Sequence, residues 1–86
     1  MRIIALDLGT KGIAVSEVRG GTVIRRWMVA DLKALEEILG ANTPPARVAF
    51  EACREAWHVH DWLLKRQHVP ILVVTTRVKT LVGIGH

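Results

Sequence analysis

Residues Ile3–Val18 read IIALDLGTKGIAVSEV, and this stretch decides how the rest of the chain is arranged. An apolar run ends in one acid, Asp7, and a glycine-containing turn over Leu8–Gly12 leads into a second apolar run. The β-branched and apolar residues predict a strand over Ile3–Asp7 that is buried on both faces. An ionised carboxylate at the end of such a strand needs a cation, a metal ion or several hydrogen-bond donors. Asp7 is therefore the first candidate functional residue.

Two further strands and a helix are expected next. Alternating side chains over Ile13–Val18 predict a second strand. The two central glycines of Arg19–Thr22 allow the positive φ angles of a tight hairpin turn, so Thr22–Val29 is expected to be an antiparallel third strand. Asp31 is a good N-cap and Gly40 a good stop for a helix between them.

The second half of the chain alternates strands and helices. After a loop, the pattern predicts a strand over Arg47–Phe50, a helix over Glu55–Gln67 and a strand over Val69–Thr75. Strand–helix–strand connections are normally right-handed parallel crossovers, so the last two strands should lie parallel to the first, away from the hairpin. The expected fold class is α/β: a five-stranded mixed sheet in the order 3-2-1-4-5 with two helices, in one domain spanning residues 1–86.

Composition narrows the class of protein. Of the 86 residues, 50% are hydrophobic and 23% are charged, a balance typical of a globular domain. We expect a cytoplasmic protein, because no apolar stretch approaches the ~20 residues of a membrane span and Asp7 interrupts any signal-peptide pattern. The net charge is +4, and its excess lies after Asp61, where four cations follow without an acid: Lys65, Arg66, Arg77 and Lys79. A basic end of this kind can contact phosphate, but it is also typical of a solvated surface.

Two acids should meet at one edge of the predicted sheet. Like the first strand, the fourth runs directly into an acid, Glu51, and neighbouring strands lie ~4.8 Å apart. Asp7 and Glu51 would then share the carboxyl ends of adjacent parallel strands, where paired carboxylates can bind Mg²⁺ or Mn²⁺. The alternative is capping: Asp7 would accept from backbone N–H groups of its own turn, and Glu51 would cap the second helix.

At these residues a family resemblance becomes visible. The segments LDLGTKGIAVSEV and VAFEAC, a tryptophan six residues after the glutamate, and PILVVTTRVK resemble, in order and spacing, the N-terminal ribonuclease-H-like domain of DEDD transposases. These insertion-sequence enzymes are similar to RuvC Holliday-junction resolvases. The resemblance covers Ile3 to Lys79. Arg54 stands where the family usually has a glycine.

The resemblance implies a DNA recombinase domain that binds Mg²⁺ or Mn²⁺ through four acids. Asp7 matches the first acid and Glu51 the second; the third and fourth would follow the fifth strand in a basic segment, and the 86 residues do not contain them. Arg77 and Lys79 are the expected nucleic-acid contacts. Family members carry a further domain with a catalytic serine, act as oligomers on DNA, and in part of the family use a guide RNA. The chain is thus expected to be a fragment that binds metal poorly and cuts little or no DNA, whereas the intact parent is an enzyme.

Two other functions compete with this interpretation. The segment DLGTKG also resembles the phosphate-binding turn of actin-like ATPases and sugar kinases, in which backbone N–H groups, Thr10 and Lys11 would approach nucleotide phosphates. A non-enzymatic nucleic-acid-binding module would instead use basic side chains: Arg25, Arg26, Arg77 and Lys79. Arg25 and Arg26 are adjacent in a strand, so they should point to opposite faces.

The positions of the cysteine, histidines and tryptophans on the predicted second helix indicate structural roles. On the second helix, Ala52, Ala56, Val59 and Leu63 form one stripe, and Cys53, Trp57, His60 and Leu64 form an adjoining stripe; we expect both to pack on the sheet. Cys53 and His60 share a helix face but His58 does not, which disfavours zinc. Trp62 lies off both stripes, which makes it the tryptophan expected at an interface.

Overall fold

The computed structural model describes residues 1–74 of the chain, and these residues form one five-stranded sheet with two helices. The strand order is β3-β2-β1-β4-β5, so the predicted α/β fold and the 3-2-1-4-5 order are confirmed. The strands and helices are β1 (Arg2–Gly9), β2 (Gly12–Arg19), β3 (Thr22–Val29), α1 (Leu32–Leu39), β4 (Ala46–Glu51), α2 (Ala56–Lys65) and β5 (Val69–Val73). The predicted end of the last strand at Thr75 lies outside the described residues.

The sheet combines an antiparallel meander with two parallel strands. Gly20 and Gly21 have φ angles of 58° and 79°, which let the chain turn back tightly from β2 into β3. β1 pairs antiparallel with β2 and parallel with β4, and β4 pairs parallel with β5. The Asp31 side chain accepts a hydrogen bond from the Ala34 N–H at 2.9 Å, so the predicted N-cap of α1 is confirmed.

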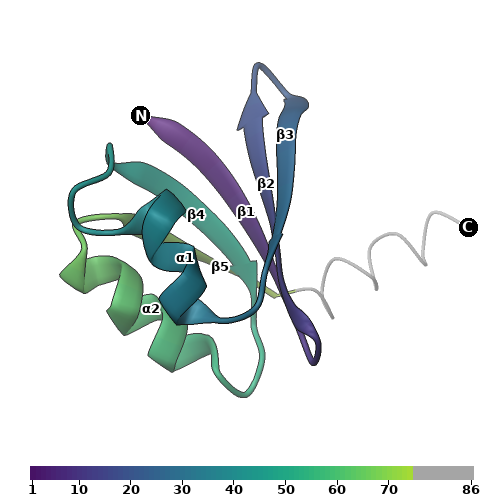
Figure 1. The fold of residues 1–86 in the computed structure, drawn as a ribbon, viewed down its shortest axis with the longest axis vertical. Coiled ribbons are helices and arrows are strands. Elements are labelled where there is room, and N and C mark those ends of the chain that lie inside the picture. Colours follow the sequence, from purple (N-terminus) through teal and green to yellow (C-terminus); the bar gives the residue numbers. More distant parts are fainter. Residues whose placement is uncertain (75–86) are drawn as a thin grey trace, which may run out of the picture.

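Both helices lie on the same face of the sheet (Figure 1). α1 leads from β3 over that face to β4, and α2 connects the parallel neighbours β4 and β5 over it. The buried side chains of the strands point toward this face. Ile4 and Leu6 of β1 stand in register with Val48 and Phe50 of β4, and all four are buried. The rest of the core comes from β2, the start of β4 and the inner sides of the helices: Ile13, Val15, Leu35, Leu39, Ala46, Ala56, Val59 and Leu63.

The expectation that β1 is buried on both faces is wrong. Ile3 is 46% exposed and Asp7 is exposed, because no helix among residues 1–74 covers the second face of the sheet. We name this second surface the open face. Strand alternation and register assign to it Ile3, Ala5, Asp7, Ala14, Ser16, Val18, Arg26, Met28, Arg47, Ala49, Glu51, Val69, Ile71 and Val73.

The second helix packs through one stripe instead of the predicted two. Ala56, Val59 and Leu63 are buried, whereas Trp57 is 70% and Leu64 51% exposed. A helix lying on a sheet presents only one side to it, and β5 beside α2 is the outer strand of the sheet. The adjoining stripe therefore lies outside the core, and the exposed tryptophan is Trp57, while Trp62 is partly buried.

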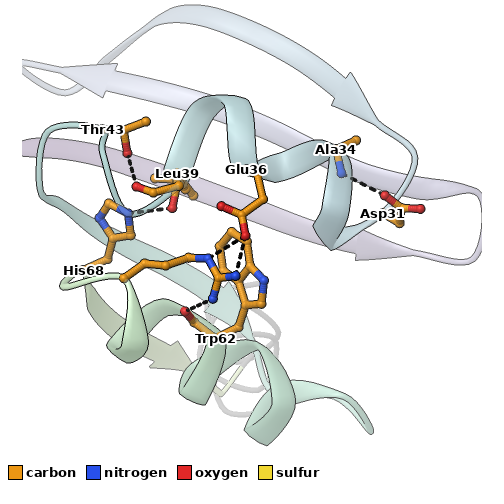
Figure 2. A network of polar contacts seen from close by, with 9 residues as sticks. Asp31, Ala34, Glu36, Leu39, Thr43, Trp62 and His68 are labelled. Atoms are coloured by element: carbon orange, nitrogen blue, oxygen red, sulfur yellow. Dashed lines mark hydrogen bonds and ion pairs between the residues drawn. The ribbon is translucent and has the colours of Figure 1, made fainter.

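Arg66 fastens α2 to α1. Its guanidinium lies 3.9 Å from the ring centroid of Trp62 and donates from Nε to the Glu36 carboxylate at 2.9 Å, with a second hydrogen bond from its Nη2 (Figure 2). This hydrogen-bonded and charged contact lowers the pKa of Glu36 below its usual value. Arg66 at the end of α2 thus joins the two helices through Glu36 of α1.

His68 is the one buried polar side chain of residues 1–74, and it links the end of α1 to the start of β4. Its Nδ1 accepts a hydrogen bond from the Ala46 N–H at 3.1 Å, at the start of β4. Its Nε2 lies 2.8 Å from the Leu39 carbonyl oxygen at the end of α1, so that nitrogen is the donor (Figure 2). The ring therefore satisfies one backbone donor and one backbone acceptor in the core.

Replacing His68 should destabilise the fold far more than replacing an exposed histidine. His68→Phe keeps a ring of similar size but leaves the Ala46 N–H and the Leu39 carbonyl without partners, which should lower the free energy of unfolding by about 2–5 kcal/mol. His58→Phe is the matched control, because His58 is exposed on α2. Urea unfolding measures both, and equal midpoints for the two variants would contradict the role of His68.

The Glu36–Arg66 contact should make stability depend on pH in the acidic range. Because the pKa of Glu36 is lower in the folded than in the unfolded chain, its contribution is present above the ordinary pKa of 4.5 and is lost as the pH falls through the folded value. Glu36→Gln should therefore flatten the decline in stability in this range, measured by urea unfolding at several pH values. The neighbouring Glu37→Gln should leave the decline as it is in the wild type.

Candidate metal site

The parallel pairing of β1 with β4 brings Asp7 and Glu51 together. Ala5 pairs with Ala49 and Leu6 with Phe50, so the next residues of the same face, Asp7 and Glu51, are neighbours at the carboxyl ends of the two strands. Both acids line one shallow depression on the open face. Val73 of β5, the register partner of Glu51, closes its side. The predicted juxtaposition of the two acids is therefore present.

Asp7 is exposed and lies between two depressions of the open face. The second depression lies over the hairpin and is lined by Ala14 and Ser16 of β2 and by Arg26 and Met28 of β3, in addition to Asp7. Among residues 1–74, Asp7 makes no ion pair and no side-chain hydrogen bond. Its carboxylate therefore faces water on an open sheet surface.

Neither acid takes the capping role that was the alternative to metal binding. The N-cap position of α2 is Glu55, four residues beyond Glu51. Within the described part of the chain, the Asp7 side chain accepts no hydrogen bond from the backbone of its turn. The turn between β1 and β2 consists of Thr10 and Lys11 alone and is closed by the paired Gly9 and Gly12.

The chemistry of this pair suits a hard divalent cation. Carboxylate oxygens are the ligands that Mg²⁺ and Mn²⁺ prefer, and the backbones of the two strands that carry these residues lie one strand spacing, ~4.8 Å, apart. Residues 1–74 contain no group of three or more histidine, cysteine, aspartate or glutamate side chains placed to hold a metal. A cation here would thus have two protein ligands from this part of the chain and water in the remaining positions. Cys53, His58 and His60 do not form such a group within that part.

The other candidate residues are not gathered at this site. Arg25 belongs to the helix-covered face, where its guanidinium lies 5.1 Å from the ring centroid of Trp27, whereas Arg26 belongs to the open face. The expectation that these two arginines point to opposite faces is confirmed. Arg77 and Lys79 lie outside the described residues.

Acidic side chains lie beside the Thr10–Lys11 turn, which the alternative interpretation assigns to phosphate binding. The depression beside Thr10 is lined by Asp31 from the start of α1 and by Glu55 and His58 from the start of α2. Two carboxylates beside the turn would repel nucleotide phosphates. The surroundings of the turn therefore disfavour a nucleotide.

Ser16, Arg26 and Met28 also lie beside Asp7, and the sequence alone did not indicate them. Asp7 pairs with Ala14, and Ala14 pairs with Met28. Counting back from the Gly20–Gly21 turn would pair Ala14 with Trp27 instead, because a β-bulge between Glu17 and Val18 shifts the register by one residue. The turn alone therefore does not reveal these neighbours.

Comparison with known proteins gave no family assignment, since neither a protein-family model nor a curated protein matches the chain. No helix among residues 1–74 has the length and apolar character needed to cross a membrane.

The turn beside the site should not accept a side chain at Gly12. Gly12 has a φ of 143°, and a Cβ there would lie 2.7 Å from the Val29 carbonyl oxygen. Gly12→Ala should therefore cost about 1–3 kcal/mol of stability. Gly20→Ala is the matched control: its φ is 58° and nothing lies within 4 Å of the added Cβ, so we expect a smaller loss in urea unfolding. A larger loss for Gly20→Ala would contradict this account.

Proposed function

We propose that Asp7 and Glu51 bind a divalent cation, and that the domain belongs to a DNA transposase or recombinase that cleaves and joins DNA with Mg²⁺ or Mn²⁺. The observation that carries this proposal is the placement of both acids on adjacent parallel strands, in one depression of the open face. The resemblance of the sequence to the ribonuclease-H-like domain of DEDD transposases supports the choice of reaction.

The two carboxylates would act as ligands and as positioning groups. Strand backbones hold them, so little order has to be created when a cation binds. When bound, the metal supplies activation of a water molecule and stabilisation of the leaving oxygen of a phosphodiester. The exposure of Asp7 leaves room for a DNA strand to approach from the side of the sheet that no helix of residues 1–74 covers.

The proposal includes partners beyond the cation. DNA is the substrate, Arg77 and Lys79 contact its backbone, and the assembled enzyme is a homo-oligomer that in part of the family also uses a guide RNA. The 86-residue chain carries two of the four expected acids, so we expect weak metal binding and little or no cleavage by this chain itself.

Metal binding at the acid pair is the first test. Added Mn²⁺ should broaden the NMR signals of Ala5 and Ala49 selectively, because these residues stand beside the two acids in the sheet. Asp7→Asn and Glu51→Gln should each strongly reduce this broadening. Asp61→Asn should not, because Asp61 lies on α2, away from the open face. Unchanged broadening in the Asp7→Asn variant would contradict the site.

The DNA part of the proposal is tested with the same chain. Branched DNA should bind with an affinity that falls steeply as salt rises, because phosphate contacts release counterions. Incubation of supercoiled or branched DNA with Mn²⁺ should give little or no cleavage. Robust cleavage that Asp7→Ala abolishes would show that these two acids suffice; binding of ATP without binding of DNA would favour the kinase-like alternative.

A further inference from the structure

The buried ring of His68 is a titratable group that the proposed metal chemistry does not use. The residue is 2% exposed and stands between the end of α2 and the start of β5. Its backbone N–H donates to the Leu63 carbonyl oxygen at 3.0 Å, which fixes it to the last turn of α2. Its ring extends toward the end of α1 (Figure 2).

The two hydrogen bonds of this ring admit one protonation state. A backbone N–H can only donate, so Nδ1 must carry a lone pair to accept from Ala46 at 3.1 Å. A carbonyl oxygen can only accept, so Nε2, 2.8 Å from the Leu39 oxygen, must carry the proton. A ring with a second proton has N–H groups on both nitrogens, and its Nδ1–H would face the Ala46 N–H. The folded chain therefore holds the neutral ring.

The charged groups on the neighbouring elements offer a positively charged ring no compensation. In the last turn of α1, the Glu36 carboxylate is bound by Arg66, and Glu37 lines a depression over β2 and β3. Neither the segment of residues 40–45 nor β5 contains a charged side chain. Burying a charge without a counter-charge is costly. The other charged side chains at the adjoining ends of α2, β1 and β4 are cations: Lys65, Arg66, Arg2 and Arg47.

We propose that His68 is a pH-sensitive contact between α1 and β4: in mild acid a proton from water binds Nδ1, the hydrogen bond from Ala46 breaks, and the start of β4 is released from the end of α1. The unfolded chain binds this proton, whereas the closed contact excludes it. Because the unfolded state then binds more protons, the folded state loses stability as the pH falls through about 7 to 6, where histidine side chains in water become charged.

The release should begin locally, because other contacts hold the chain beside His68. The Arg2 guanidinium donates to the Pro44 carbonyl oxygen, and the Thr43 hydroxyl donates to the Gly40 carbonyl oxygen at 2.7 Å. Val48, in the middle of β4, is fully buried between β1 and β5. The Ala46 amide should therefore lose its protection against hydrogen exchange before the Val48 amide does.

Urea unfolding of the whole chain from about pH 7.5 to about pH 5.5 is the first test. Over this interval the unfolding equilibrium constant of the wild type should rise about tenfold. His68→Gln offers one acceptor and one donor but takes up no proton, so its constant should change far less. His58→Gln is the matched control, because His58 is exposed on α2, and it should keep the wild-type dependence. The Glu36–Arg66 contact does not contribute, since Glu36 titrates at lower pH.

Hydrogen exchange and NMR of the wild type test the same contact without a substitution. The protection factor of the Ala46 amide should fall over this pH interval while that of Val48 persists, and the nitrogen shifts of the His68 ring at neutral pH should show the proton on Nε2. A ring that takes up a second proton while Ala46 stays protected would overturn the proposal. A His68→Gln chain whose stability falls with pH as steeply as that of the wild type would overturn it as well.

Discussion

The parallel pairing of β1 with β4 is the constraint on which the rest of the structure depends. It places Ile4 and Leu6 beside Val48 and Phe50, and these four buried residues form the part of the core that the sheet contributes at its centre. A parallel neighbour for β1 also forces the chain to cross over the sheet after β3, so α1 must lie on one face. The same pairing also brings Asp7 and Glu51 side by side at the carboxyl ends of the two strands. The register between β1 and β4 therefore determines both the core and the candidate site.

The two ends of this pairing differ in how they are held. At the amino end, the Arg2 guanidinium donates to the Pro44 carbonyl oxygen at 2.6 Å, and His68 joins the end of α1 to the start of β4. At the carboxyl end, two carboxylates stand side by side on the exposed surface. A buried histidine and an exposed arginine link the elements at the first end, whereas at the second end Asp7 keeps its charge in water, where the desolvation cost is small. The contacts that stabilise the fold thus lie at the amino ends of the two strands, and the candidate functional residues lie at their carboxyl ends.

Much of this fold was predictable from local sequence. Gly20 and Gly21 specify the hairpin, Asp31 and Gly40 bound α1, and the strand order follows from the handedness of crossovers. Burial of β1 was not predictable in the same way, because the run before Asp7 is equally apolar whether one or two faces are covered. The period of α2 defined its two stripes, but only the position of the sheet decides which stripe is buried. His68 escaped notice because its hydrogen-bond partners lie 22 and 29 residues away in the sequence.

The coverage of a single face also changes how the acid pair has to be understood. In a strand buried on both sides, Asp7 would need a compensating charge merely for the fold to form. On the open face it needs none, since water solvates it, so stability does not explain an acid at this position. What the fold contributes is the pairing: two strands whose spacing is fixed by their own hydrogen bonds bring a second carboxylate beside the first. Neighbouring carboxylates on a rigid sheet are the donors that a hydrated divalent cation prefers, so the proposed metal site rests on this pairing and not on the stability of the fold.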